Sequence, residues 1–261
     1  MHHLESPAFV RPDKFVRVVN GDIFQLGKHR LICGNATDPE IAKKLLGGEK
    51  PRLMVTDPPY GVEYDASWRS KVLDRRSEGA VGKVLNDDRH DWREAWALFP
   101  GDIAYVWHAG LHATDVDLSL RAADFRVRSQ IIWDKGRLII SRGHYHWRHE
   151  PCWYAVRKLK TANWQADRKQ TTVWQIPHRR STSGHSTEKP IECMRRPILH
   201  HTLQGDAVYD PFLGSGTTMI AAEITGRRCF SIELSPEYCG LAIARWEQLT
   251  GQKARLISRS S

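Results

Sequence analysis

The sequence predicts an α/β fold in which helices cover a doubly wound, mostly parallel sheet. Two observations carry this prediction. Apolar runs typical of buried strands alternate with helical segments along most of the chain, and two short motifs each follow such a run directly. Open sheets of this kind bind ligands at the carboxyl ends of their strands. We therefore expect both motifs to lie at one edge of the sheet.

Local signals define the individual elements. Asp38-Pro39, an N-cap followed by proline at the first helical position, should begin a helix that ends at Gly47-Gly48. Pro190 should open a second helix in the same way. The expected strands are 30–33, 52–56, 102–107, 127–133, 151–157, 207–209 and 228–233, and the further helices are 114–123, 217–225 and 236–249.

The places where this alternation stops indicate the domain organisation. Residues 1–20 carry prolines and mixed charge and are expected to form an N-terminal arm. The main domain should span 21–250, and 251–261 should form a loose tail. Two polar, basic stretches interrupt the main domain at 64–92 and 158–186. A loop as long as the first is usually functional or disordered, and its place directly after the first motif favours a function.

Composition narrows the classes of function. A chain of 261 residues with 41% hydrophobic composition can bury a substantial core, as one large domain or a domain with an inserted lobe. The formal net charge of +9 favours a polyanionic partner, although charge alone fits simple solubility equally well. The five cysteines are scattered without a CxxC pair, as expected of reduced thiols in a cytoplasmic protein. The sequence has no apolar stretch near the roughly 18 residues that span a membrane.

The two motifs carry the chemistry. The first is Asp57-Pro58-Pro59-Tyr60, after the apolar run 53–56, and the second is the glycine loop 210–218, after the run 207–209. The first places a carboxylate, rigid backbone carbonyls and an aromatic face at the end of a strand. The second places glycines between a strand and a helix, where the backbone can approach a small ligand closely. Together they describe a site that holds a cofactor beside a flat substrate bearing an amine.

Both motifs resemble those of the amino-group DNA methyltransferases, which use S-adenosylmethionine, and their order resembles the β class of that family. The resemblance spans about 21–246, which is most of the chain. It implies a Rossmann-like methyltransferase fold in which 64–92 is a DNA-clasping loop and 158–186 is an inserted target-recognition region. Further matching segments are Trp133-Asp134-Lys135, His149-Glu150, Thr172-Val173-Trp174 and Thr187-Glu188-Lys189-Pro190.

The resemblance implies an S-adenosylmethionine site around the second motif. Glycines in this loop should remove side chains where the ligand lies against the backbone, and Glu233 ends the next strand, where doubly wound folds place an acid on ribose hydroxyls. A tight turn and a helix cap are the alternative interpretation, and Asp210-Pro211-Phe212 before the glycines together with Glu233 after them argue against it. Asn35 stands where the family usually has aspartate, which leaves the contact with the adenine end open. The expected cofactor contacts are Asn35, Ala36, Asp57, Lys189, Asp210, Pro211, Phe212, Gly214, Ser215, Gly216, Thr217, Thr218 and Glu233.

The first motif supplies the expected catalytic residues, Asp57, Pro58, Pro59 and Tyr60. An exocyclic amine is a poor nucleophile because its lone pair is delocalised into the ring of the base. If the Asp57 carboxylate and the Pro58 carbonyl accept its hydrogen bonds, they favour the pyramidal form and offset the positive charge that grows on nitrogen. Tyr60 offers a flat face on which a flipped-out base can stack.

The two basic stretches are expected to hold double-stranded DNA through phosphates and base edges. A tryptophan core with a solvated basic rim is the alternative for the second stretch. We expect both, with Trp174 packing inward from a strand and the arginines facing DNA. The expected DNA contacts are Arg69, Lys71, Arg75, Arg76, Lys83, Arg168, Lys169, Arg179 and Arg180.

Four residues that could bind a metal lie close together in the sequence. They are His144, His146, His149 and Cys152. However, His149 falls on a family segment that binds no metal, and thirteen histidines make chance clusters common. The sequence therefore predicts no metal site.

The resemblance implies site-specific transfer of a methyl group from S-adenosylmethionine to N6 of adenine in duplex DNA. Aspartate at the first position of the motif accompanies adenine in the family, and Asp57 fits that pattern. Transfer to N4 of cytosine is the alternative, because both amines demand the same chemistry. A catalytically silent DNA-binding regulator is the alternative from another class, and the intact Asp57 and Tyr60 argue against it. Relatives of the β class are often dimers, which leaves a homodimer open.

Overall fold

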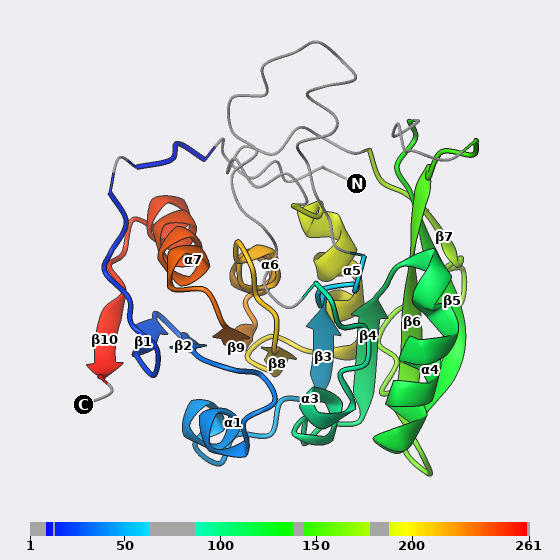
Figure 1. Cartoon of the computed structure of the whole chain (residues 1–261), viewed down its shortest axis with the longest axis horizontal. Helices are drawn as coiled ribbons and strands as arrows, with labels where there is room; N and C mark the ends of the chain where they lie inside the picture. Colours follow the sequence, from blue (N-terminus) through cyan, green and yellow to red (C-terminus); the bar gives the residue numbers. More distant parts are fainter. Residues whose placement is uncertain (1–8, 13, 63–86, 138–143, 178–187, 260–261) are drawn as a thin grey trace.

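The structure is a computed structural model that describes residues 9–12, 14–62, 87–137, 144–177 and 188–259. Its centre is one ten-stranded sheet in the order β10-β1-β2-β9-β8-β3-β4-β6-β5-β7 (Figure 1). The strands are β1 Ile23–Leu26, β2 His29–Cys33, β3 Leu53–Thr56, β4 Ile103–Trp107, β5 Phe125–Asp134, β6 His149–Arg157, β7 Val173–Gln175, β8 Ala207–Asp210, β9 Arg228–Glu233 and β10 Arg255–Ser258.

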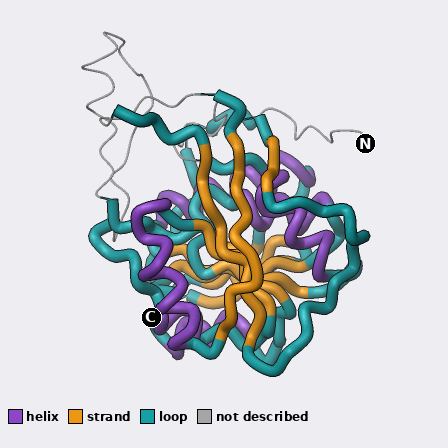
Figure 2. Tube along the Cα trace, turned by 90° about the vertical axis from the view of Figure 1, so that its right-hand side faces the viewer, coloured by secondary structure: helices purple, strands orange, loops and turns teal. Residues whose placement is uncertain are grey.

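Helices cover both faces of this sheet, as Figures 1 and 2 show. One hydrophobic cluster packs α5, α6 and α7 on one face, and a second packs α1, α3 and α4 on the other. This two-sided core confirms the predicted doubly wound α/β fold. The helices are α1 Pro39–Leu46, α3 Arg93–Ala97, α4 Ala113–Ala122, α5 Ile191–His201, α6 Thr217–Ile224 and α7 Pro236–Thr250, and a 3₁₀ turn η1 spans Gly110–His112.

The strands β2, β9, β8, β3 and β4 form a parallel block in the centre of the sheet. The strand β6 enters between β4 and β5 and runs antiparallel to both. The predicted strand 151–157 is therefore present, but it reverses the direction of its neighbours. The sheet is mostly parallel, as predicted, with an antiparallel extension at each end.

Helix boundaries follow the signals in the sequence. Asp38 caps α1 by accepting a hydrogen bond from the backbone N–H of Glu40, Pro39 occupies the first turn, and Gly47 ends the helix in a left-handed conformation. Ser235 caps α7 in the same way and Gly251 ends it. Both helices begin directly after loops at the carboxyl edge of the sheet, so these signals also fix where the loops end.

Both ends of the chain are better packed than the sequence suggests. The prediction of a loose tail over 251–261 is wrong for β10, which pairs antiparallel with β1, a strand that the sequence analysis missed. Leu256 of β10 packs against the core, and this burial explains the ordered strand. Phe15 lies against Gly240 of α7, and Val18 is buried in the core.

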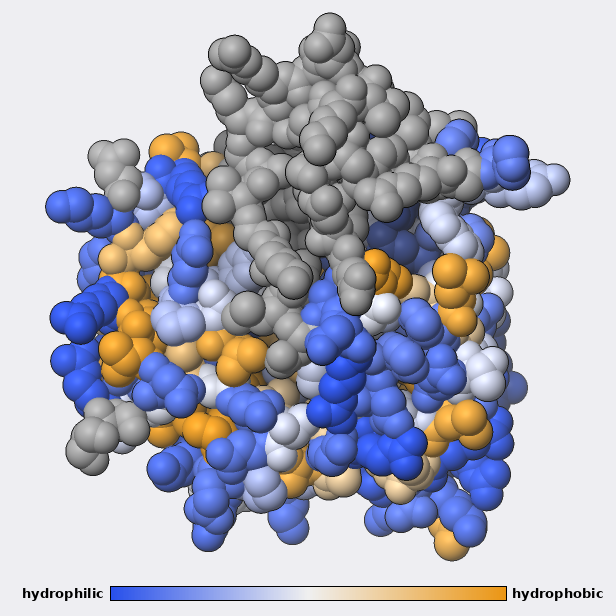
Figure 3. Space-filling model, in the orientation of Figure 1, coloured by the Kyte–Doolittle hydropathy of each residue, from blue (hydrophilic) through white to orange (hydrophobic). Residues whose placement is uncertain are grey.

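The surface in Figure 3 is mostly hydrophilic, with hydrophobic residues scattered between the polar ones. Within the described residues, no helix combines the length and the apolar character needed to cross a membrane.

Candidate active site

The two motifs follow adjacent parallel strands. Strand β3 ends at Thr56 beside β8, which ends at Asp210, and the two strands pair in parallel. The Thr56 hydroxyl donates a hydrogen bond of 2.7 Å to the Oδ1 atom of Asp210, and both side chains are buried. This bond joins the catalytic strand to the strand of the glycine loop. The predicted meeting of the two motifs at one edge of the sheet is confirmed.

A buried charge network occupies the end of β3. The ammonium of Lys189, which is only 5% exposed, lies 2.7 Å from each of three oxygen atoms: Oδ1 of Asp57, the hydroxyl of Tyr60 and Oε2 of Glu150. The Tyr60 hydroxyl donates to the same Asp57 Oδ1 atom at 2.6 Å. Lys135, at the end of β5, forms an ion pair with the other oxygen of Glu150. Lysines and carboxylates thus alternate through the network.

Two groups of this network, Glu150 and Lys189, are held in the ionised state by their neighbours. Burial disfavours a charge on Lys189, but Asp57 and Glu150 outweigh that effect and raise the pKa of the ammonium. Burial acts against Glu150 as well, yet Lys189 and Lys135 lower the pKa of this carboxyl to about 2. Burial, followed by the neighbouring carboxylates, raises the pKa of Tyr60, so its hydroxyl keeps its proton. At neutral pH, Glu150 is an anion and Lys189 is a cation.

Within the described part of the chain, only one oxygen of the Asp57 carboxylate accepts hydrogen bonds. Both Lys189 and Tyr60 bond its Oδ1 atom, and the side chain remains 25% exposed. Its Oδ2 atom therefore keeps lone pairs for an incoming N–H donor.

Side chains of the segment 87–92 form hydrogen bonds with the backbone of the first motif. Oδ1 of Asp87 accepts hydrogen bonds from the backbone N–H groups of Tyr60 and Gly61, at 3.2 and 3.0 Å. The Trp92 indole N–H donates to the Pro59 carbonyl at 3.1 Å. The sequence analysis treated this stretch as the end of a polar loop and missed both contacts. Their effect is to fix the path of the chain directly after Asp57.

Two buried carboxylates organise the glycine loop. Glu233, at the end of β9, accepts hydrogen bonds from the backbone N–H of Gly214 at 2.7 Å and of Ser235 at 2.8 Å. Burial raises the pKa of Glu233 to about 7, although these N–H donors oppose the shift. Burial likewise raises the pKa of Asp210 to about 6, against the hydrogen bonds from nearby hydroxyls and from the Phe212 N–H. Both acids therefore titrate near neutral pH.

The two glycines of the loop have different surroundings. Both have positive φ angles, 56° at Gly214 and 94° at Gly216. A Cβ atom on Gly216 would lie 3.0 Å from the Cβ atom of Ala242 in α7, which is a tight approach. A Cβ atom on Gly214 would meet no atom of the described residues within 4 Å. Gly216 allows the loop to pack on α7, whereas Gly214 borders open space beside Glu233.

An arginine from α7 links the glycine loop to the segment that carries Lys189. Arg245 is buried, and its guanidinium donates to the backbone carbonyl and the hydroxyl of Ser215, at 2.7 and 2.9 Å. Its other terminal nitrogen donates to the Glu188 carboxylate. Glu188 directly precedes Lys189, so one side chain holds both loops in register.

Comparison with known proteins identifies this arrangement. Residues 52–244 match the model of a protein family described as DNA methylase, and this match covers well over half of the chain. The chain belongs to that family. The type II methyltransferase M.XycI of Xanthomonas campestris pv. cyanopsidis is 36% identical over an aligned length of 258 residues. The match covers 79% of this chain and 83% of M.XycI.

Solved structures show that this DNA methylase shares its fold with other methyltransferases. The crystal structure of an M1.HpyAVI–SAM complex has a TM-score of 0.60 and 22% identity, and the likeness covers 81% of this chain and 96% of that one. The cytosine-N4-specific PvuII DNA methyltransferase has a TM-score of 0.62 and 16% identity, covering 87% and 92%.

The expected contacts of the methylase with the adenine end of a cofactor lie beside the glycine loop. The backbone N–H of Gly34 donates to the Glu233 carbonyl at 2.9 Å, which brings the following residues Asn35 and Ala36 to the same edge. The Asn35 side chain accepts hydrogen bonds from the N–H and the hydroxyl of Thr37 and so stabilises its own turn. The cofactor role of Asn35 and Ala36 stays a prediction.

The structure groups the remaining predicted cofactor residues in the same loop. Pro211, Ser215, Thr217 and Thr218 are buried around the start of α6, and the Phe212 ring packs edge-on against Trp92 at 4.7 Å. Lys189, by contrast, contacts the catalytic side of the site. Its expected role beside the cofactor stays a prediction.

The DNA-binding residues are only partly described. Arg168 and Lys169 are exposed before β7, and Trp174 packs inward from that strand, as predicted. The other predicted DNA contacts lie outside the described residues: Arg69, Lys71, Arg75, Arg76, Lys83, Arg179 and Arg180.

The cluster considered for a metal in the sequence does not assemble. Within the described part of the chain, His144, His146, His149 and Cys152 form no group with metal-binding geometry, and Cys152 is buried in the core. Another group of possible ligands, which no sequence motif marks, lies near the first motif and is considered below.

Several residues of this site escaped the sequence analysis. Glu150 and Lys135 stand in segments that match the family, so the resemblance carried a signal that was not used for the site. Asp87, Trp92 and Arg245 have no local signal, because each acts on a loop that is distant in the sequence.

Proposed function

We propose that this DNA methylase transfers a methyl group from S-adenosylmethionine to N6 of a flipped-out adenine at a specific site in double-stranded DNA. The observation that carries the proposal is the buried hydrogen bond between Thr56 and Asp210, which holds the two motif loops side by side. A cofactor at the glycine loop would then lie next to an amine on Asp57.

The residues around the glycine loop fit S-adenosylmethionine. Asp210 and Glu233 are buried acids whose contacts, within the described residues, are with N–H and O–H groups. Uncompensated buried carboxylates favour a cationic ligand. S-adenosylmethionine supplies, when bound, a methyl group on a cationic sulfonium. The open space beside Gly214 leaves room for such a ligand next to Glu233.

The catalytic residues act on the target amine before and during transfer. Asp57 Oδ2 and the Pro58 carbonyl accept its two N–H groups, which favours the pyramidal nitrogen and offsets its growing positive charge. The hydrogen bond from the Tyr60 hydroxyl to Asp57 fixes the ring on which the base would stack. The nearby cation of Lys189 would oppose a positive charge on the amine, and Glu150 offsets it at 2.7 Å.

The leftover proton needs no strong base, because the methylated amine is cationic before it loses the proton. Asp57 or water can accept it. The base must leave the duplex stack to reach Asp57, at a cost of a few kcal/mol.

The target base separates two versions of this proposal. Aspartate at the first motif position favours adenine, and the fold likeness to a cytosine-N4-specific enzyme keeps N4 of cytosine as the second candidate. Nucleoside mass spectrometry of duplex DNA treated with the purified protein and S-adenosylmethionine distinguishes them. We expect N6-methyladenine. N4-methylcytosine without N6-methyladenine would overturn the adenine assignment, and DNA without new methyl groups would overturn the proposed activity. A homodimer stays a prediction.

A further inference from the structure

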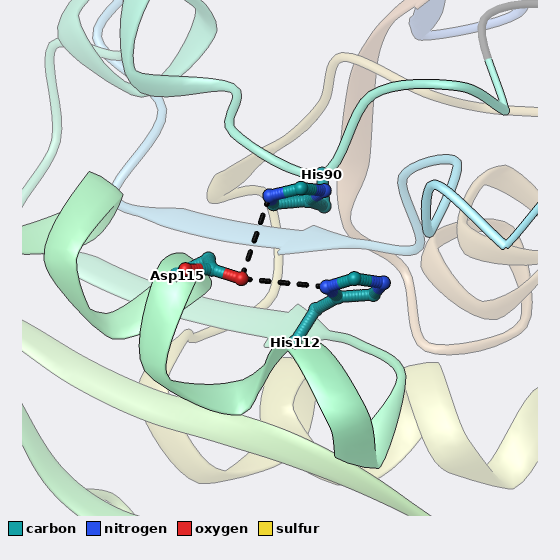
Figure 4. A group of neighbouring side chains, drawn as sticks. All are labelled: His90, His112 and Asp115. Atoms are coloured by element: carbon teal, nitrogen blue, oxygen red, sulfur yellow. Dashed lines mark hydrogen bonds and ion pairs between the residues drawn. The ribbon is translucent and has the colours of Figure 1, made fainter.

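A group of three potential metal ligands lies on the face of the molecule next to the first motif. His90 comes from the segment that holds this motif, His112 ends η1, and Asp115 lies in the first turn of α4 (Figure 4). The two imidazole rings are stacked, with centroids 4.3 Å apart and an angle of 7° between the planes. In Figure 4 one nitrogen of each ring faces the carboxylate of Asp115.

The distances in this group match those of a metal site. Nε2 of His90 lies 3.4 Å from Oδ2 of Asp115, and Nδ1 of His112 lies 3.3 Å from the same oxygen. In a tetrahedral zinc site with bonds of about 2.0–2.1 Å, neighbouring ligand atoms are about 3.3 Å apart. All three ligand atoms lie within 4.8 Å of one another. Because the two rings are nearly parallel, their in-plane lone pairs do not yet converge, and one ring must turn about its Cβ–Cγ bond for both nitrogens to face one ion.

We propose that His90, His112 and Asp115 bind a divalent transition-metal ion. Two imidazoles and one carboxylate suit zinc, cobalt or nickel better than magnesium or calcium, which prefer oxygen ligands. The three side chains are between 25% and 45% exposed, so an ion can enter from solvent and water can complete its coordination.

The position of this site connects it with the catalytic loop. His90 lies against Gly61, where a Cβ atom would be 3.1 Å from the His90 Nδ1 atom. On either side of His90, Asp87 binds the backbone of Tyr60 and Gly61, and Trp92 binds the Pro59 carbonyl. An ion on His90 would therefore join the segment that holds the motif to the start of α4.

Calorimetric titration of the purified, metal-free protein with zinc chloride tests the proposal. The wild-type protein should bind one equivalent of zinc, with a higher affinity than His90→Ala or His112→Ala. Each variant should weaken the binding by more than about tenfold, the lower end of what loss of even an outer-shell partner costs. His144→Ala is the matched control, since it removes an exposed histidine elsewhere on the surface, and it should leave this affinity unchanged.

Cobalt(II) gives a second measurement that does not depend on activity or on the affinity of other histidines. The wild-type protein should show the intense visible absorption of a tetrahedral cobalt site, and His112→Ala should lose it while thermal unfolding without metal stays cooperative. Equal zinc binding by wild type and both ligand variants would overturn the proposal. So would a cobalt spectrum that is the same in the wild type and in His112→Ala, because these side chains would then not hold the ion.

Discussion

The two loops at the carboxyl edge of the sheet are held in opposite electrostatic ways. In the first motif, Asp57 and Glu150 share the ammonium of Lys189, and the cation keeps the pKa of Glu150 near 2. In the glycine loop, burial raises the pKa of Asp210 to about 6 and that of Glu233 to about 7. The same residue type is thus fixed as an anion on one side and titrates near neutral pH on the other.

This difference indicates what each loop is prepared to receive. The network around Asp57 already contains its cations, so a neutral amine can enter without changing the net charge of the site. The pair Asp210 and Glu233 lacks a cationic partner within the described residues, so a cationic ligand would relieve the cost of their burial. Under the proposed function, the first loop would act on the transition state and the glycine loop would bind the cofactor.

The largest expected effect comes from removing the carboxylate of the first motif. Asp57→Ala should reduce methyl transfer by at least about 100-fold, the usual cost of removing one group that stabilises transition-state charge. The affinity for S-adenosylmethionine should fall far less than turnover, because most of the expected cofactor contacts lie in the glycine loop and not at Asp57. Turnover measured with tritiated cofactor, together with calorimetry of cofactor binding, checks both parts.

A second variant, Asp57→Asn, keeps the shape of the side chain and removes only its charge. It should also lose most activity if the carboxylate charge is what matters. Turnover within a few-fold of wild type in either variant would contradict the proposed role of Asp57.

The next effect separates the two glycines of the second loop. Gly216→Val should destabilise the fold by about 2–5 kcal/mol, since it combines a strained positive φ with a clash against Ala242. Gly214→Ala should cost only about 1 kcal/mol because its new methyl group points into open space. Chemical denaturation followed by circular dichroism measures both changes.

Among variants that still fold, substitutions at Gly214 should reduce the affinity for the cofactor more than substitutions at Gly216. Larger side chains at Gly214, such as Gly214→Val, should weaken S-adenosylmethionine binding more than they weaken the fold, because they enter the space beside Glu233. If calorimetry shows wild-type affinity for Gly214→Val, the cofactor does not lie there.

The same contrast explains how much the sequence could predict. The parallel strands and the cap at Asp38-Pro39 have local signals, and the motifs mark the ends of their strands, so both loops were placed on one edge. The antiparallel insertion of β6 between β4 and β5 has no such signal. Strand β10 has none either, because its partner β1 is distant along the chain, whereas β1 pairs with the neighbouring β2 across the turn at Gly27 and Lys28.

The candidate site follows the same rule. The glycine loop depends on neighbouring residues and on Glu233, which a spacing rule for doubly wound folds indicates. The network around Asp57 depends on Lys189 and Glu150, which lie far from it in the sequence. Sequence proximity therefore predicted the binding loop better than the charge network.

A pH effect tests the difference between the carboxylates. The pKa of Glu233 is raised in the folded protein, so its contribution to stability is present below the ordinary value of 4.5 and is lost as pH rises through about 7. At about 1.4 kcal/mol per pKa unit, the contribution is at most about 3.5 kcal/mol. Glu233→Gln should remove this part of the pH dependence of the ligand-free protein, as measured by denaturation between pH 4.5 and 8.

Cofactor binding should show the opposite trend in the wild type. The affinity for the cationic cofactor should rise as pH increases through about 7, where Glu233 becomes charged. Asp210 titrates in the same direction at a lower pH, so part of the dependence should remain in Glu233→Gln. Identical pH profiles for wild type and variant would show that Glu233 is already ionised in the ligand-free protein.

The smallest effect concerns the exposed basic residues before β7, which lie outside both loops. If Arg168 and Lys169 contact phosphates, each contact releases counterions, and replacing both by glutamine should reduce the slope of log K against log salt by about 1.8 in magnitude. Turnover at saturating DNA should stay near that of wild type, because neither residue belongs to the network around Asp57. Lys43→Gln together with Lys44→Gln, in α1, is a control of equal charge. An unchanged slope for the Arg168 and Lys169 variant would place the DNA on another surface. An equal change of slope for the Lys43 and Lys44 control would mean that the effect comes from overall charge alone.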